Sequence, residues 1–256
     1  MARTLGYETQ GNGPRHVLVM HDWFSDRSSW DPVRPFLSND STYAFVDFRG
    51  YGASRDIEGS YTLDEASTDV LALADALRWD RFSAVGHSMS TLVLQKLLQL
   101  APERVAKGVL ITPVPPTGMR LDDHWREMSR KLALADDERR VEALRQFWGP
   151  RLGDRWIQYK ARRWSETAVR SAAAAYVDMY GRTDISEGAR GIRTPLLVVA
   201  CEQDSPPFRG PALREQLLPD YPGARLASIA DSSHYPMQET PPLLAALLEG
   251  FLGESA

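Results

Sequence analysis

The sequence predicts an α/β fold: a mostly parallel, doubly wound sheet with a helical segment inserted between two of its late strands. Short apolar runs recur along the 256 residues, and each run ends in a turn or a polar residue. Helical patterns separate these runs over the first part of the chain, and one long segment shows helical pattern alone. Together these observations indicate a parallel sheet covered by helices.

The predicted strands are near-continuous apolar runs, as expected for parallel strands that are buried on both faces. They cover residues 16–20, 42–46, 82–85, 108–111, 195–200 and 225–229. Residues 67–77 and 91–100 show helical spacing between them. Alternation of strand and helix implies right-handed crossovers, and hence a doubly wound sheet.

The helical segment has no strand pattern from about residue 121 to residue 191, and Gly149, Pro150 and Gly153 divide it into several short helices. We therefore expect a core of residues 1–118 and 192–256 and a helical cap, or lid, of residues 119–191. Such an insertion would cover the carboxyl ends of the strands, where open α/β sheets bind ligands. A structural excursion without a ligand role is the alternative.

Composition describes an ordinary globular chain, with 43% hydrophobic and 25% charged residues. A formal net charge of -4 argues against a dedicated nucleic-acid-binding protein. The single cysteine, Cys201, excludes an internal disulfide framework and fits a reducing compartment. No run is long enough to span a membrane, and the first residues lack a signal-peptide pattern. We expect a cytoplasmic protein without nucleic-acid or membrane partners.

Cofactor and metal sites are not expected. The five histidines are scattered and do not form a metal-ligand cluster with the one cysteine. Gly50 and Gly52 follow a predicted strand but lack the complete dinucleotide fingerprint.

The strongest chemical signal is the segment Gly86-His-Ser-Met-Ser90, which follows a predicted strand directly and precedes a predicted helix. This context is that of the nucleophile elbow, G-x-S-x-G, in which a sharp turn exposes the serine and requires small neighbours. Ser90 replaces the usual glycine and is the mildest departure. We expect Ser88 to be the nucleophile; an ordinary strand-to-helix turn is the alternative.

A nucleophilic serine needs a histidine base, which in this fold comes last in the chain order Ser, acid, His. Only two histidines follow Ser88. His124 lies in the helical segment and is expected on the surface, whereas His234 follows the last predicted strand, where the base belongs.

The acid that orients this histidine should follow the penultimate strand, and Asp204 is the favoured residue. Glu202 and Asp231 are rivals. Glu202 is close to the strand end, and Asp231 is better suited to structuring its own turn.

Acyl transfer also requires amide donors for the oxyanion. We assign one to the backbone N–H of Met89, directly after the nucleophile and at the start of a helix. The other is assigned to the backbone N–H of Trp23, in the loop after the first long strand.

Several segments together resemble the α/β-hydrolase superfamily, in order and spacing over nearly the whole chain. They are residues 21–30, 47–54, 86–90, 202–204 and 234–241. Within the superfamily the chain resembles small bacterial esterases and the plant strigolactone- and karrikin-type receptor hydrolases, which also carry serine at the position of Ser90. The resemblance implies Ser88 as nucleophile, Asp204 as acid and His234 as base. It also implies a lid at the helical insertion and an oxyanion hole from Trp23 and Met89.

Asp22 departs from the pattern of this superfamily, which has His-Gly where this chain has His21-Asp22. An inward carboxylate would oppose a developing oxyanion. We expect instead that Asp22 points outward or caps a local turn without catalytic effect, because the donor needed is a backbone amide. His21 is expected to brace the loop.

The cap offers aromatic side chains that could line a pocket over Ser88, although packing is the usual role of such residues. They are Trp125, Trp148, Trp156, Trp164, Tyr176 and Tyr180, together with Met179. The pairs Arg139-Arg140 and Arg162-Arg163 are expected to form a solvated face. Attraction of an anionic substrate is the alternative, although no spacing demands it.

These observations favour a serine hydrolase that cleaves a small, fairly apolar ester, thioester or lactone. The resemblance also admits a C–C bond hydrolase, a haloperoxidase-like perhydrolase or a cofactor-free oxygenase. A ligand sensor with slow or vestigial hydrolysis is the third possibility. The sequence does not indicate the substrate or the oligomeric state.

Overall fold

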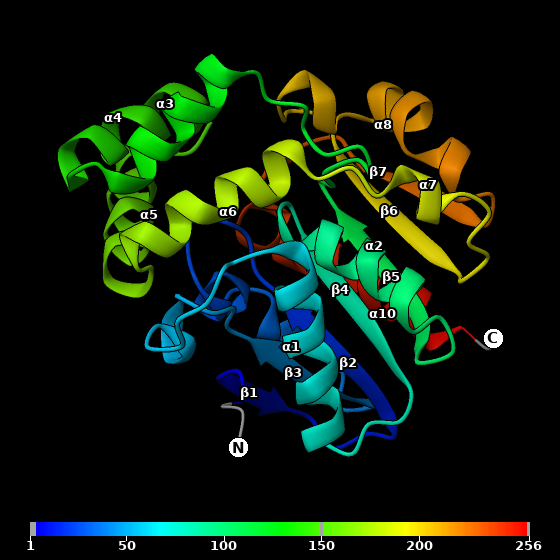
Figure 1. Ribbon diagram of the computed structural model, residues 1–256. Helices are drawn as coiled ribbons and strands as arrows, with labels where there is room; N and C mark the ends of the chain where they lie inside the picture. The colour runs from blue at the N-terminus through cyan, green and yellow to red at the C-terminus, as the bar shows by residue number, and fades with distance from the viewer. Residues whose placement is uncertain (1–3, 149–150, 255–256) are drawn as a thin grey trace.

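The structure is a computed structural model that describes residues 4–148 and 151–254. A sheet in the order β1-β3-β2-β4-β5-β6-β7 runs through the molecule (Figure 1), and β1 alone is antiparallel to its neighbour. The strands are β1 (Tyr7–Gln10), β2 (Arg15–Met20), β3 (Ser41–Val46), β4 (Phe82–His87), β5 (Val105–Ile111), β6 (Leu196–Cys201) and β7 (Ala224–Ile229). The predicted fold class is confirmed.

Strand β1 escaped the sequence analysis because it lies at the edge of the sheet. Its residues are mostly exposed and polar, so they lack the apolar run that marks the parallel strands.

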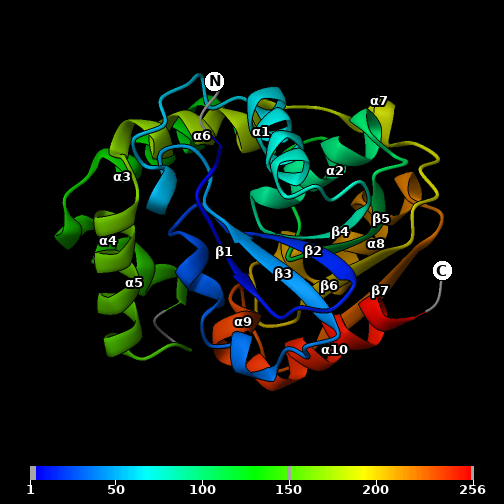
Figure 2. The same ribbon diagram turned by 90° about the horizontal axis from the view of Figure 1, so that it is seen from below.

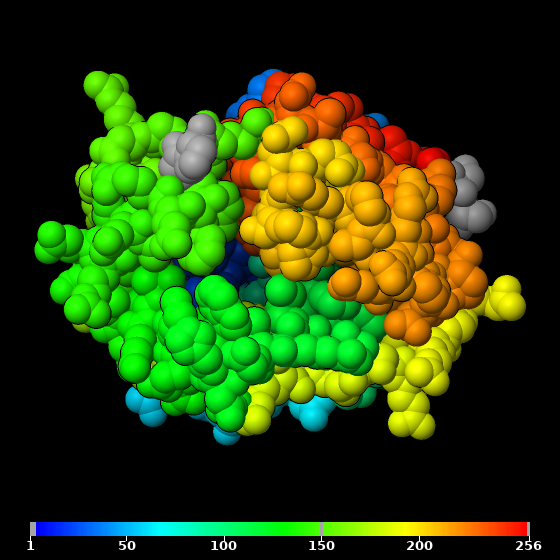
Figure 3. All heavy atoms as spheres, turned by 90° about the horizontal axis from the view of Figure 1, so that it is seen from above, coloured from blue at the N-terminus to red at the C-terminus, as the bar shows by residue number. Residues whose placement is uncertain are grey.

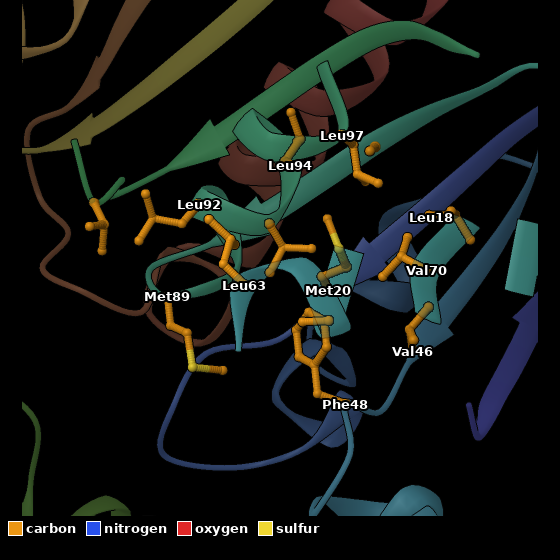
Figure 4. Close-up of a cluster of buried hydrophobic side chains, with 14 of the residues drawn as sticks. Leu18, Met20, Val46, Phe48, Leu63, Val70, Met89, Leu92, Leu94 and Leu97 are labelled. Carbon is orange, nitrogen blue, oxygen red and sulfur yellow. The ribbon is translucent and has the colours of Figure 1, made fainter. Parts of the chain in front are cut away.

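Helices cover both faces of the sheet (Figure 2). Helices α1 (Leu63–Ala76), α2 (Ser90–Leu100) and α8 (Gly210–Gln216) pack on one face, and α10 (Pro241–Gly253) packs on the other. Successive strand residues alternate between the two layers, so Leu18 and Met20 face α1 and α2 (Figure 4), while Val17 and Val19 face α10. Cys201 is buried in the second layer, as packing would predict.

The chain between β5 and β6 forms the helices α3 (Asp123–Leu134), α4 (Asp137–Trp148), α5 (Asp154–Thr167), α6 (Arg170–Arg182) and α7 (Ser186–Ala189). Helices α3 to α6 stand together beside the sheet (Figure 1). Gly149 and Pro150, predicted as a helix break, lie outside the described residues. Among the described residues, no helix is long and apolar enough to cross a membrane.

The helical segment shares its buried side chains with the sheet layer. Trp164 of α5 and Tyr176 of α6 belong to the same apolar cluster as Trp23 and Met89. Trp23 Nε1 also donates a hydrogen bond to the Ala173 carbonyl at 2.7 Å. The loop after β2 is therefore held against the cap by packing and by a direct hydrogen bond.

Arg140 corrects one expectation for the cap, because it is fully buried rather than part of a solvated face. Its guanidinium lies 4.3 Å from the ring centroid of Trp164 and donates to the Ala133 carbonyl at 2.6 Å. A planar, weakly hydrated guanidinium suits such stacking. The sequence pattern could not reveal the burial of Arg140, because the adjacent Arg139 is of the same residue type and is exposed.

Candidate active site

Ser88 lies at the tip of the turn between β4 and α2 with φ of 53°, in the left-handed region that a serine rarely adopts. Its amide donates to the Ile111 carbonyl at 3.0 Å, which ties the turn to β5. A Cβ added to Gly86 would approach the Ser90 carbonyl oxygen at 2.9 Å and the Thr91 Cα at 3.0 Å. Strand and helix thus pass too closely at Gly86 for any side chain.

Ser90 fits its position because its hydroxyl is used by the turn itself. Its Oγ accepts the His87 amide at 2.9 Å and lies 3.2 Å from the Met20 carbonyl at the end of β2. The serine in place of glycine therefore braces the elbow against the neighbouring strand.

His234 and Asp204 are brought together from the two loops that follow β7 and β6. His234 Nδ1 lies 2.7 Å from Asp204 Oδ2, and both side chains are buried. Burial lowers the pKa of His234, but the Asp204 carboxylate outweighs it, and the net pKa is above the usual histidine value. Asp204 Oδ1 accepts the Ser205 amide at 2.6 Å, which orients the carboxylate.

The rival residues lie elsewhere. His124 and Asp231 are exposed, and Glu202 is half-buried and would face a side chain placed at Gly210. None of these three lines the cavity that contains Ser88.

His87, inside the elbow motif, has a role that the sequence analysis missed. Its Nε2 donates to the His234 carbonyl at 2.7 Å, and burial lowers its pKa to about 3. A neutral His87 therefore holds the backbone of His234 in place. In the sequence, only its position next to Ser88 pointed to this role, because the motif G-x-S-x-G allows any residue type there.

One cavity of about 430 Å³ brings Ser88, Asp204 and His234 together with Trp23 and Met89. It opens between the cap and the loop after β6, which contributes Ser205 and Phe208, and atoms of the first part of the chain are visible at its floor (Figure 3). Ser88 and Met89 come from the elbow, Trp23 from the loop after β2, and the other two from loops after β6 and β7.

The remaining lining is almost entirely apolar. Its members are Phe24, Val114, Met119, Leu121, Trp125, Met128, Ser129, Leu132, Ala143, Gln146, Phe147, Trp148, Tyr180, Ser205 and Phe208. No lysine or arginine is among these described residues. The wall is therefore suited to a neutral, apolar ligand.

Of the cap residues considered from sequence, Trp125, Trp148 and Tyr180 line the cavity. Trp156, Trp164, Tyr176 and Met179 do not belong to its lining and pack elsewhere. The sequence did not predict three further aromatic residues of the cavity lining, Phe24, Phe147 and Phe208. An aromatic residue in a helix or loop carries no sequence signal that distinguishes lining a cavity from packing in the core.

The amides assigned to an oxyanion hole border the same cavity. Met89 directly precedes α2, and Trp23 is held by its indole and by the Tyr51 hydroxyl, which donates to the Trp23 carbonyl at 2.8 Å. Within residues 4–148 and 151–254, neither amide donates a hydrogen bond to a protein acceptor. Both are therefore available to a ligand oxygen.

Asp22 is fully buried, so the expectation that it points outward is wrong, whereas the alternative of a local cap is correct. Its Oδ2 accepts the Phe24 amide at 3.1 Å and the Tyr235 hydroxyl at 2.8 Å. Its Oδ1 lies 3.6 Å from Nζ of Lys160 on α5. His21 braces the loop as expected, since its Nε2 accepts the Phe48 amide at 3.1 Å.

No group of three or more His, Cys, Asp or Glu side chains among the described residues is placed to hold a metal ion.

The model of the alpha/beta hydrolase family matches residues 17–247. The chain belongs to this family. Serine hydrolase-like protein of Danio rerio is 36% identical over 104 residues, covering 39% of this chain and 32% of the relative. Pimeloyl-[acyl-carrier protein] methyl ester esterase of Nitrosomonas europaea is 36% identical over 118 residues, covering 46% of this chain and 44% of the relative. The chain thus spans less than half the length of each of these two curated relatives.

Bromoperoxidase from Bacillus anthracis shares the fold of this hydrolase-family chain with a TM-score of 0.85 over 97% of this chain and 95% of that one. At 21% sequence identity, this similarity shows a shared fold and nothing about a shared activity. The family and the relatives support the prediction of a hydrolase enzyme, and the link to receptor hydrolases stays a prediction.

Proposed function

We propose that this protein is a serine hydrolase that cleaves a small, neutral, apolar carboxylic ester, thioester or lactone. Ser88 attacks the carbonyl carbon, and His234 takes the Ser88 proton and delivers it to the leaving group. Asp204 keeps the His234 proton on Nδ1 and stabilises the imidazolium that forms. The oxyanion is held by the amides of Trp23 and Met89. Water activated by His234 then hydrolyses the acyl-enzyme.

The observation that supports this proposal most strongly is the convergence of Ser88, His234 and Asp204 in one apolar cavity. The 2.7 Å contact between His234 and Asp204 and the positive φ of Ser88 suit this chemistry. The names of the serine hydrolase-like and methyl ester esterase relatives support ester cleavage.

Nucleophile and bond type are tested together with Ser88→Ala. Wild-type protein is expected to hydrolyse p-nitrophenyl butyrate and to be labelled by a fluorophosphonate, and Ser88→Ala should lose both while its melting temperature is retained. Unchanged turnover in Ser88→Ala rejects the proposal. Oxygen consumption with a heteroaromatic substrate that persists in this variant would support the oxygenase alternative instead.

Substrate charge is tested with two esters of similar length. Because the cavity lining lacks lysine and arginine, p-nitrophenyl butyrate should be cleaved with higher kcat/KM than the mono-p-nitrophenyl ester of succinic acid. A preference for the succinate ester would reject the neutral substrate class and leave the serine mechanism intact.

A further inference from the structure

Asp22 presents an electrostatic conflict next to the proposed oxyanion hole. It directly precedes Trp23, whose amide is one of the proposed oxyanion donors, and it is fully buried. A buried carboxylate at this place acts against the negative charge that develops on the substrate carbonyl. The same carboxylate holds the loop, because it accepts the Phe24 amide directly after Trp23.

Lys160, on α5 of the cap, places a positive charge beside the Asp22 carboxylate. Its Nζ lies 3.6 Å from Asp22 Oδ1, and both side chains are at most 1% exposed. Nζ also lies 3.3 Å from each of the hydroxyls of Ser25 and Ser29 and 4.2 Å from the ring centroid of Tyr235. A buried ammonium needs such a set of partners to offset its lost hydration.

The ionisation of Asp22 is supported by its neighbours. Burial would raise the pKa of Asp22, but Lys160, His87 and His21 and the Tyr235 hydroxyl hold it below its usual value. The Tyr235 hydroxyl, the Phe24 amide and the Ser29 hydroxyl all donate to the carboxylate and do not depend on Lys160. These three donors favour the ionised form of Asp22 also when Lys160 is replaced by a neutral residue.

Both members of the pair also act on His234, with opposite signs. Asp22 raises the pKa of His234 and Lys160 lowers it. The titratable and charged groups around His234 are Asp204 after β6, His87 at the end of β4, Asp22 after β2, Lys160 on α5 and the adjacent Tyr235. The buried side chain of Glu239 in α9 (Pro236–Glu239) also lies near, because its carboxylate accepts the amides of Ser233 and Tyr235.

We propose that Asp22 and Lys160 form a buried, charge-neutral pair in which Asp22 holds the oxyanion loop and Lys160 cancels its charge at the catalytic centre. Lys160 is thus a positioning residue that acts through Asp22, and α5 of the cap contributes to catalysis as well as to the pocket. This inference rests on the proposed serine mechanism. A glycine at position 22 would carry no charge and would need no such cation.

The test compares Lys160→Met, Asp22→Asn and the double variant with wild type, using p-nitrophenyl butyrate across pH. Lys160→Met should lower kcat about tenfold with little change in KM, because an uncompensated Asp22 opposes the oxyanion. Addition of Asp22→Asn should restore kcat to within about threefold of wild type.

The pH profile supplies a readout that a merely structural role does not move. His234 must be neutral to act as base, so the acid limb of kcat/KM follows its pKa. The limb should shift to higher pH in Lys160→Met, which removes a cation, and to lower pH in Asp22→Asn, which removes an anion. The double variant should lie between them.

The matched control is Lys131→Met, because Lys131 lies on the cap with Glu127 at the same distance of 3.6 Å but is 74% exposed. It should leave kcat and the limb unchanged. Limb shifts in the same direction for both single variants, or a double variant as slow as Lys160→Met, would overturn the inference. Ser88→Ala is measured alongside, so turnover surviving that variant rejects the proposed function rather than the role of the pair.

Discussion

Asp204→Asn should inactivate His234 as the base, because it reverses the tautomer of the His234 imidazole, while the site stays assembled. Asp204 Oδ1 accepts the Ser205 amide at 2.6 Å, so the carbonyl oxygen of an asparagine would stay on that side. Its NH2 group then faces His234 Nδ1 at the position where Oδ2 lies 2.7 Å away. Two donors cannot face each other, so Nδ1 loses its proton and Nε2 carries it. The imidazole can no longer accept the serine proton.

The expected loss in kcat is about 10³- to 10⁴-fold, or about 4 to 5.5 kcal/mol of activation free energy. Initial rates with p-nitrophenyl butyrate at pH 8 measure it, and thermal unfolding followed by circular dichroism verifies that the variant is folded. Glu202→Gln is the control, because that carboxyl follows the same strand outside the cavity lining. A rate for Asp204→Asn within tenfold of wild type, or a larger loss in Glu202→Gln, would refute the reasoning.

Further predictions concern the base, the elbow and the pocket. Activity should fall as pH drops through a His234 pKa above the usual histidine value, because Asp204 raises that pKa, and a kcat/KM acid limb below pH 6 would contradict this. Gly86→Ala should cost about 1 to 3 kcal/mol of stability, since its Cβ would meet backbone at 2.9 Å; chemical denaturation measures it, and an unchanged midpoint would count against the close approach. Ser90→Ala should cost about 1 to 3 kcal/mol because the buried His87 amide loses its acceptor, whereas Ser83→Ala, on strand β4 with His87, should be nearly neutral. Trp148→Ala, which removes an indole stacked 5.9 Å from the His234 ring centroid, should raise KM for p-nitrophenyl butyrate more than it lowers kcat; an unchanged KM would indicate that the indole does not contact substrate.

The sheet and the elbow could be predicted from sequence because the signals are local. Buried parallel strands require continuous apolar runs, and the turn at Ser88 requires small residues at Gly86 and Ser90. The edge strand β1 could not be predicted in this way, because its residues are mostly exposed and need not be apolar. His234 and Asp204 followed from chain order, and their contact of 2.7 Å agrees with that order.

What the sequence by itself determined was the fold class and the order of the chemical groups along the chain. Only the tertiary structure decided which cap side chains reach the cavity, because an aromatic residue at helical spacing packs or lines a pocket according to the neighbour it meets. The burial of Arg140 and the pairing of Asp22 with Lys160 belong to the same category. A charged side chain can be buried only where a partner lies close to it. Because that partner comes from a distant part of the chain, the local sequence around the charged residue does not indicate it.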